Sequence, residues 1–183
     1  MQSNHETYVS VDVETAGPNP SQYSLLSIGA CLASNPMHGF YIELQPVNRH
    51  VTKESFDIHH LSLDELAVRG TPPADALHQF ETWLASNAPK PVFVAFNAPF
   101  DWMFVNDYFL RFLGRNPFGH TALDIKALYM GACGTTWDAT RMRVMLPQLN
   151  LESNPLSHNA LSDARDQAKI FNAILEKIKR GDQ

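Results

Sequence analysis

Apolar and polar side chains alternate most regularly near the start of the sequence. In the segment "YVSVDVETAG", three valines alternate with Ser10, Asp12 and Glu14. Successive side chains of an extended chain point to opposite faces. The pattern therefore predicts a strand over residues 7–14 that carries the valines on one face and both carboxylates on the other.

Three further segments have the composition of strands. Residues 24–33 and 39–45 are β-like, and the turn-forming "AGPNPSQ" and "SNPMHG" separate the first three strands, which predicts a meander. Residues 91–96, "PVFVAF", form a short continuous apolar run. Such a run is typical of a buried central strand.

Helical spacing of apolar residues dominates the rest of the chain. Helices are predicted for "PADALHQFETWLASN", for "APFDWMFVNDYFLRFLG" and for "NALSDARDQAKIFNAILEKIKR", while "TALDIKALYM" suggests a short strand that leads into a helix. Three meandering strands followed by alternating helices and strands indicate the α/β class, with a mixed sheet flanked by helices. No repeat or linker divides the chain, so residues 1–183 are expected to form one domain.

Composition narrows the class of partner. The chain has 183 residues, 44% hydrophobic composition and a formal net charge of −5. That size allows a sizeable core. The negative charge disfavours a broad electrostatic grip on a long duplex. It does not exclude a pocket for one phosphate at a time if several carboxylates hold divalent cations.

The sequence shows no signal for export or membrane insertion. "MQSNHETYVS" has no basic start followed by an apolar run, and no segment approaches the roughly 18 apolar residues of a membrane span. Cys31 and Cys133 lack metal-ligand spacing, and Cys31 lies in an apolar run that suggests the core. Reduced cysteines in a cytoplasmic protein without a membrane partner are the expectation.

The first candidate site is Asp12-x-Glu14 on the predicted N-terminal strand. A half-exposed strand with a solvated face explains such a pair when it is seen alone. Two carboxylates on adjacent positions of one face repel each other, however, and a cation between them would relieve the repulsion.

The second candidate site follows the predicted central strand in "AFNAPFDWMF". Asn97 can cap the next helix, and Asp101 in its first turn complements the helix dipole, so local helix physics is one sufficient explanation. The alternative is functional, because the carboxyl end of a central strand is where α/β sheets build their sites. Asn97 is also a candidate substrate contact.

The third candidate site is "SHNALSDARDQ", at the start of the last predicted helix. Asn159 is expected to cap this helix, and Asp163 follows in its first turn. His158 is either an ordinary loop histidine or a group that projects to the same side as Asp163.

Taken together, the order and spacing of the three motifs resemble those of the DEDDh exonucleases, the family that includes the proofreading subunit of bacterial DNA polymerase III, ribonuclease T and oligoribonuclease. The resemblance covers about residues 7–177 and implies a ribonuclease H-like fold. It implies an enzyme that removes nucleoside 5′-monophosphates from the 3′ end of single-stranded nucleic acid with two divalent ions, Mg²⁺ or Mn²⁺. The implied metal ligands and catalytic residues are Asp12, Glu14, Asp101 and Asp163, with His158 as general base.

The resemblance also implies substrate contacts. The backbone around Thr15 and Ala16 is expected to receive the terminal 3′-hydroxyl group. "IHHLS" occupies the place where many relatives have His-Gly-apolar, which makes His59 and Leu61 candidate contacts to the last sugar and base, although His60 replaces the glycine. Phe100 is expected both to pack in the core and to lie beneath the base.

Several alternatives stay open. Arg141 and Arg143 either meet upstream phosphates or belong to an ordinary solvated surface. The chain ends soon after the last predicted helix, which slightly favours RNA over DNA. A DNA-trimming or proofreading nuclease, a ribonuclease H-type endonuclease and a catalytically silent 3′-end-binding module are the competing interpretations. A homodimer is a further expectation, because "DWMFVNDYFLRFL" has apolar residues to spare.

Overall fold

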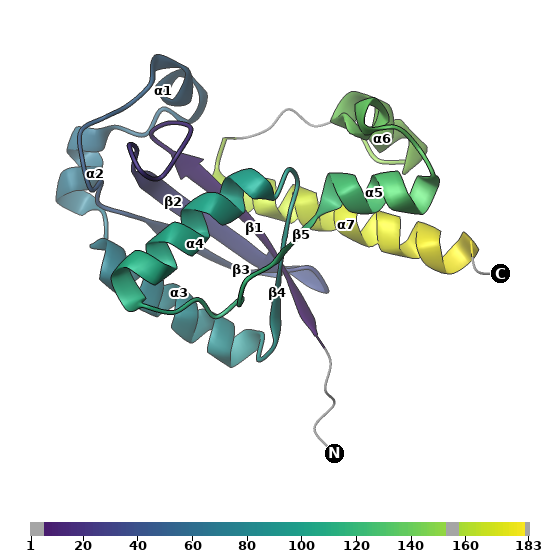
Figure 1. Cartoon of the computed structure of the whole chain (residues 1–183), viewed down its shortest axis with the longest axis horizontal. Helices are drawn as coiled ribbons and strands as arrows, with labels where there is room; N and C mark the ends of the chain where they lie inside the picture. Colours follow the sequence, from purple (N-terminus) through teal and green to yellow (C-terminus); the bar gives the residue numbers. More distant parts are fainter. Residues whose placement is uncertain (1–5, 153–157, 182–183) are drawn as a thin grey trace.

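The computed structural model describes residues 6–152 and 158–181. Its centre is a five-stranded mixed sheet with the strand order β3-β2-β1-β4-β5 (Figure 1). β1, β2 and β3 are joined in antiparallel pairs, whereas β4 runs parallel to both β1 and β5. The predicted α/β class with a mixed sheet is therefore confirmed. The strands span Thr7–Thr15 (β1), Leu25–Leu32 (β2), Asn35–Glu43 (β3), Pro91–Ala95 (β4) and Ala122–Asp124 (β5).

Helices pack on both faces of this sheet. One apolar core joins the sheet to α3 and α4, and a second joins it to α5, α6 and α7. Within the described ranges, no helix has both the length and the apolar character that a membrane span requires. The helices span Lys53–His59 (α1), Leu63–Arg69 (α2), Pro73–Asn87 (α3), Pro99–Leu113 (α4), Ile125–Cys133 (α5), Met142–Gln148 (α6) and Ala160–Gly181 (α7), with a 3₁₀ turn at Trp137–Thr140 (η1).

The alternation along β1 decides which core each face meets. Val9, Val11 and Val13 belong to the core beneath α3 and α4. Tyr8, on the opposite face, packs against Phe171 of α7 with 5.0 Å between the ring centroids. By the period of two, the polar positions of β1 share the face of Tyr8 and turn toward α7.

Two differences from the sequence predictions have local causes. β3 begins at Asn35 rather than at residue 39, and only residues 33–34 form the turn before it. Pro36 is tolerated there because β3 is an edge strand, where the missing N–H group breaks no ladder. The helices α1, α2 and α6 and the turn η1 were not predicted, because segments of seven residues or fewer are too short to display a helical period.

The aromatic helix α4 packs into the core of its own chain. Its buried residues include Phe104, Val105, Tyr108 and Phe109, and further apolar residues of the helix pack partly buried against the same cluster. Leu110 is the exposed large apolar residue of α4, at 50% exposure. Little apolar surface on α4 is left to support a dimer contact, and the homodimer stays a prediction.

Cys31 is fully buried beside Ala164 and Ala168 of α7, as predicted. Its thiol lies 3.6 Å from the carbonyl oxygen of Ala164. Burial raises its pKa to about 11, which keeps the thiol protonated at neutral pH. Cys31 is therefore a packing residue between β2 and α7.

Candidate active site

β1 supplies two carboxylates at the centre of the sheet. The strand lies between β2 and β4, and Asp12 stands directly opposite Gly29 of β2. Glu14 follows two residues later, is 9% exposed and stands opposite Ser27. β2 pairs with β1 at both positions, whereas the pairing with β4 covers only residues 7–10, so the antiparallel ladder with β2 fixes the positions of these carboxylates.

α7 reaches the same place because Gly29 has no side chain. A Cβ atom at Gly29 would lie 2.1 Å from the carbonyl carbon of Ala160 and 2.1 Å from the amide nitrogen of Leu161. The first turn of α7 therefore crosses β2 in backbone contact at the level of Asp12. Asn159 caps the helix as predicted, since its Oδ1 accepts a hydrogen bond from the amide of Ser162 at 3.1 Å.

The crossing brings a third carboxylate to the pair on β1. Asp163 is 4% exposed, and ligand oxygens of Asp12, Glu14 and Asp163 all lie within 4.8 Å of one another. Carboxylate oxygens are the donors that Mg²⁺ and Mn²⁺ prefer, and this spacing allows one ion to contact all three groups. The donor set fits the divalent metals that the sequence suggested.

Asp101 lies beside this cluster without belonging to the three-carboxylate group. It sits in the first turn of α4, is 5% exposed, and its Oδ1 accepts a hydrogen bond from the amide of Val13 at 3.1 Å. That bond ties α4 to β1 between the two strand carboxylates. One carboxylate oxygen of Asp101 is thus engaged by the backbone, and the other is left for a ligand or a bridging water.

Burial and mutual repulsion dominate the electrostatics of the four carboxyl groups. Burial, helped by the charge of Asp163, raises the pKa of Glu14 to about 7. Burial raises the pKa of Asp101 to about 8 against the opposing hydrogen bond from Val13. The pKa of Asp12 also lies well above its ordinary range, through burial and then through the charges of its three neighbours. A cluster that resists ionisation in this way is stabilised by a cation.

Gln167 was missed by the sequence reasoning. Its Nε2 donates a hydrogen bond of 2.6 Å to Oδ1 of Asp12, and its Oε1 accepts one of 2.8 Å from the amide of Phe96. The side chain is 5% exposed. It extends from α7 and joins Asp12 to Phe96, the residue after β4, and so fixes the orientation of Asp12. The signal was available, because Gln167 lies one helical turn after Asp163 on the same face.

Asp124, at the end of β5, caps α5 and also binds the start of α4, where Asn97 was expected to act as the cap. Its Oδ2 accepts a hydrogen bond from the amide of Ala98 at 2.7 Å, and its Oδ1 accepts one from Ala127 at 2.7 Å. The predicted cap by Asn97 is wrong, because Asn97 is exposed and has a left-handed backbone with φ of 67°. The N-cap of α4 is Ala98. Whether Asn97 contacts substrate stays a prediction.

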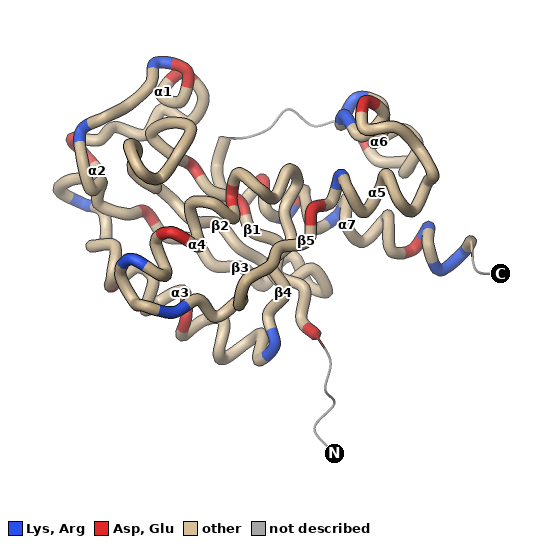
Figure 2. The backbone as a smooth tube through the Cα atoms, viewed as in Figure 1, with Lys and Arg blue, Asp and Glu red and all other residues tan. Residues whose placement is uncertain are grey.

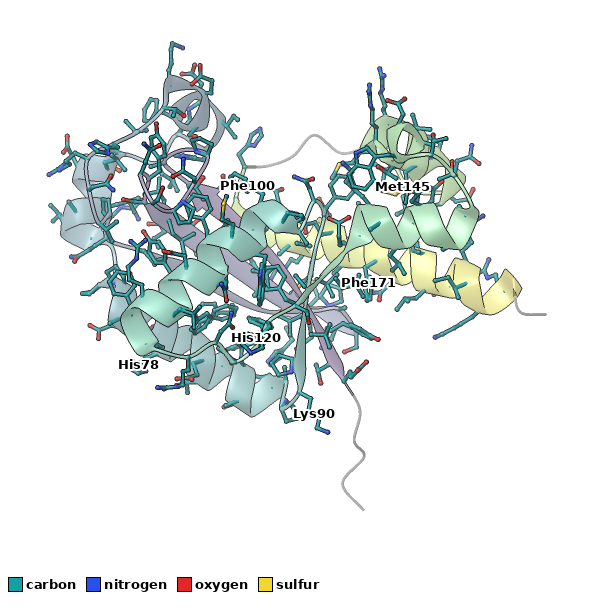
Figure 3. The ribbon with its side chains drawn as sticks, in the orientation of Figure 1. His78, Lys90, Phe100, His120, Met145 and Phe171 are labelled. Carbon is teal, nitrogen blue, oxygen red and sulfur yellow. The ribbon has the colours of Figure 1, made fainter. Side chains whose placement is uncertain are left out.

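A pocket of about 200 Å³ opens beside Glu14. The structure brings three of the predicted substrate contacts, Thr15, His59 and Phe100, to its wall. Phe100 also lies 5.5 Å from Phe104 between ring centroids and packs against the core, as expected (Figure 3), while its contact with a base stays a prediction. The lining residues are Val13, Glu14, Thr15, Ser55, Ile58, His59 and Phe100.

Both ring nitrogens of His59 are engaged within the protein. Nδ1 accepts a hydrogen bond from the amide of Leu61 at 2.9 Å, so Nε2 carries the proton that it donates to the carbonyl oxygen of Thr15, 3.1 Å away. His59 therefore ties α1 to the end of β1 and offers the pocket its carbon edge. His60 adopts φ of 56°, the left-handed conformation that glycine would take at this C-cap.

Two predicted contacts lie away from the pocket wall. Ala16 is fully buried, and its amide donates to the carbonyl oxygen of Ser24 at 2.8 Å. Leu61 packs against the small apolar cluster of Ala16, Leu26 and Leu66. Both lie next to the end of β1, where Thr15 stands, and their contact with substrate stays a prediction.

His158 stands on the rim of the site, before the first turn of α7. Its side chain is exposed, and its backbone is left-handed with φ of 53°. Burial lowers the pKa of His59, and the charges of His60 and His158 lower it further against the opposing hydrogen bond to Thr15. The role of His158 as general base stays a prediction.

A carboxylate cluster at the end of the central strands of such a sheet defines a metal-dependent nuclease site, and comparison with known proteins assigns its class. The RNase_T family model, described as exonuclease, matches residues 9–171. The chain belongs to this family and is a 3′–5′ exonuclease of the DEDDh type.

Individual relatives cover nearly the whole chain. The 3′-5′ DNA exonuclease Cap18 of Escherichia coli is 44% identical over 177 residues, which are 95% of this chain and 94% of the relative. Ribonuclease T of Klebsiella pneumoniae is 30% identical over 189 residues, covering 94% of this chain and 86% of the relative.

Solved structures show the same fold. The nuclease domain of 3′hExo, a DEDDh family member bound to rAMP, superposes with a TM-score of 0.76 at 16% identity, covering 96% of this chain and 94% of that one. Exonuclease I of E. coli in complex with single-stranded DNA gives a TM-score of 0.70 at 16% identity, covering 97% of this chain and 42% of that one. The expected ribonuclease H-like fold is confirmed.

Proposed function

We propose that this exonuclease hydrolyses the 3′-terminal phosphodiester bond of single-stranded DNA and releases nucleoside 5′-monophosphates. The observation that carries the proposal is the convergence of Asp12, Glu14 and Asp163 within 4.8 Å, beside a pocket of about 200 Å³ that Glu14 also lines. We also propose that residues 1–183 act as one exonuclease domain, which the family match over residues 9–171 supports.

The proposal of DNA as substrate reverses the slight preference for RNA that the sequence suggested. The position of the chain end slightly favoured RNA, but the likeness to a DNA exonuclease is stronger, at 44% identity, than the likeness to ribonuclease T, at 30%. Both likenesses extend over most of each chain. RNA remains the second candidate, supported by the ribonuclease T relatives.

The carboxylates are proposed to hold two divalent ions. Two such ions, when bound, neutralise charge at the phosphorus and help both the attacking water and the departing oxygen. Asp12 would bind both ions, Glu14 and Asp163 would hold the ion on the side of the attacking water, and Asp101 would steady the other, directly or through water. Gln167 fixes the orientation of Asp12 by its 2.6 Å hydrogen bond.

His158 is proposed to accept the proton of the attacking water. Its exposed side chain, two residues before α7, would let the imidazole take that proton and return it to solvent. Thr15, His59 and Phe100 would meanwhile hold the last nucleotide against Glu14. Stacking on Phe100 tolerates every base, so the pocket would grip a 3′ end without reading its sequence.

The test is a digestion time course on 5′-labelled single-stranded DNA and RNA of matched sequence, with Mg²⁺, Mn²⁺ or EDTA. We expect a metal-dependent ladder that shortens from the 3′ end, faster on DNA, with 5′-monophosphates as product. The Asp163→Asn variant is the inactive control. A faster RNA ladder would overturn the choice of polymer. Tight binding of 3′ ends without cleavage would instead indicate a silent binding module.

A further inference from the structure

An exposed stack of aromatic and cationic side chains lies on the α5–η1–α6 segment. Nζ of Lys126 is 4.2 Å from the centroid of the Trp137 ring and 5.8 Å from that of Phe96. Trp137 is 52% exposed although it is the largest type of apolar side chain. Lys126 covers part of one face of the indole, and much of the remaining ring is open to solvent.

This segment is basic within an acidic protein. Residues 125–150 contain three cations, Lys126, Arg141 and Arg143, and one carboxylate, Asp138, in a chain of net charge −5. Arg141 forms an ion pair with Asp138. Within residues 6–152 and 158–181, Lys126 and Arg143 have no carboxylate partner. Figure 2 shows Lys and Arg positions at the start of α5 and on α6.

Two sets of contacts place this surface at the edge of the carboxylate site. Phe96, which Lys126 approaches, donates its amide to Gln167, and Gln167 donates to Asp12. Independently, Met142 of α6, the neighbour of both arginines, lines a pocket of about 150 Å³ together with Asp163 and Gln167. The nucleotide pocket beside Glu14 is instead walled by α1, which lies away from α5 and α6 (Figure 1).

We propose that Trp137, Lys126 and Arg143 form a binding surface for the single strand upstream of the scissile bond. A base of the incoming strand stacks on the open part of the Trp137 ring, while the two unpaired cations contact its phosphates. The inference rests on the proposed function and deepens it, because it adds a second point of attachment for strands that extend beyond the terminal nucleotide.

Packing alone accounts poorly for this arrangement. A tryptophan that served the core would bury its ring, and a lysine that served solubility would not lie against two aromatic rings. Stacking also compensates for the overall acidity, because it attracts a strand without needing a large basic area. The strand is thereby gripped without preference for sequence.

The test compares a dinucleotide with a 12-nucleotide homopolymer of the polymer that the wild-type protein degrades faster. Initial rates of removal of the 3′ nucleotide with Mg²⁺ give kcat and KM for both lengths. Trp137→Ala is expected to raise KM of the 12-mer roughly 5- to 150-fold and to leave its kcat and both constants of the dinucleotide unchanged. Trp137→Phe should keep most of the affinity.

Lys126→Gln gives a separate readout. It should raise KM of the 12-mer and make the slope of log KM against log salt shallower by about 0.7, the value for one phosphate contact on a single strand. Matched controls are Leu110→Ala, an exposed apolar residue on α4, and Lys177→Ala, an exposed cation far along α7. Both controls should behave as the wild type at both lengths.

The outcomes distinguish failure of the upstream surface from failure of the proposed function. Suppose that the wild-type protein cleaves both lengths. If Trp137→Ala then changes KM for neither length, or changes KM for both lengths equally, the upstream surface is refuted while the proposed function stands. If the wild-type protein cleaves neither length with Mg²⁺ or Mn²⁺, the proposed function is refuted and the inference falls with it.

Discussion

The two halves of the carboxylate site are built in different ways. Asp12 and Glu14 lie on β1, where the antiparallel ladder with β2 holds the backbone. Asp163 and His158 come from the first turn of α7 and the residue two before it, and they reach the site because α7 crosses β2 at Gly29. One half is therefore positioned by local backbone pairing, and the other by the packing of a helix on the sheet.

This difference predicts different sensitivities. The geometry of the strand half should survive in any variant that preserves the sheet ladder, whereas the geometry of the helix half should be lost when the distance between α7 and β2 increases. Gln167 connects the halves by its hydrogen bond from α7 to Asp12, and Asp101 of α4 is tied to β1 by the amide of Val13. Perturbing each of these features in turn tests the comparison.

The largest effect is expected from removing one carboxylate of either half. Asp12→Asn and Asp163→Asn keep the shape of the side chain and should lower kcat by roughly 10³-fold or more, because each removes a charge from the metal ligands. Asp166→Asn, in the same turn of α7 but paired with Lys169, is the matched control and should remain active. Measured nuclease rates within tenfold of the wild type would contradict the assigned roles.

Gly29→Ala should break only the helix half. The added Cβ would meet the backbone of α7 at 2.1 Å, so the helix must move away and carry Asp163 with it. We expect a loss of about 1–3 kcal/mol in the free energy of unfolding together with weakened Mg²⁺ binding. Urea denaturation and calorimetry measure the two effects. Gly131→Ala, on α5 with open space around it, is the control and should be neutral or stabilising.

Gln167→Leu should loosen the connection between the halves without moving either backbone. Asp12 would lose its 2.6 Å hydrogen bond, and the amide of Phe96 would lose its partner. Loss of such an orienting group typically lowers metal affinity 10- to 100-fold. Calorimetric titration with Mn²⁺ in the absence of substrate provides the measurement, and unchanged affinity would argue that Asp12 is oriented by the strand alone.

The metal-free protein should lose stability as the pH rises. Glu14 and Asp101 have pKa values raised to about 7 and about 8, against ordinary values near 4, so the folded chain binds their protons more tightly than the unfolded chain does. The contribution of these two groups to the free energy of unfolding is therefore fully present below about pH 4 and is lost as the pH rises through 7 to 8. We expect Tm in EDTA to fall across this range, and Mg²⁺ to raise Tm more at pH 8 than at pH 6.

A Glu14→Gln, Asp101→Asn double variant supplies the control for this pH profile. It cannot ionise at either position, so its Tm in EDTA should change less between pH 6 and pH 8 than that of the wild type. An equal decline in both proteins would assign the effect to other groups.

The smallest effect is expected at His60, on the α1 side of the pocket. His60→Gly removes the cost of a left-handed conformation at φ of 56° and should stabilise the fold by up to about 1 kcal/mol. His60→Ala removes the same imidazole but keeps the strain, so it should give no gain. Denaturation midpoints of the two variants distinguish backbone strain from loss of the side chain.

The sequence by itself determined the strand half of the site. Alternation of valines with Ser10, Asp12 and Glu14 places both carboxylates on one face wherever the strand pairs, because the period of two is a property of the extended backbone. The cap by Asn159 and the position of Asp163 in the first helical turn were equally local, since a helix start is specified by a few neighbouring residues.

Only the tertiary structure decided how these pieces meet. The role of Gly29 depends on a helix more than a hundred residues away, and the hydrogen bond from the amide of Ala98, at the start of α4, to Asp124 depends on β5 lying beside β4. The hydrogen bond of Gln167 to Asp12 likewise joins residues 155 positions apart. Local periodicity fixes which way a side chain points on its own element, but contacts between distant elements arise only when the layers pack, and those contacts complete the site.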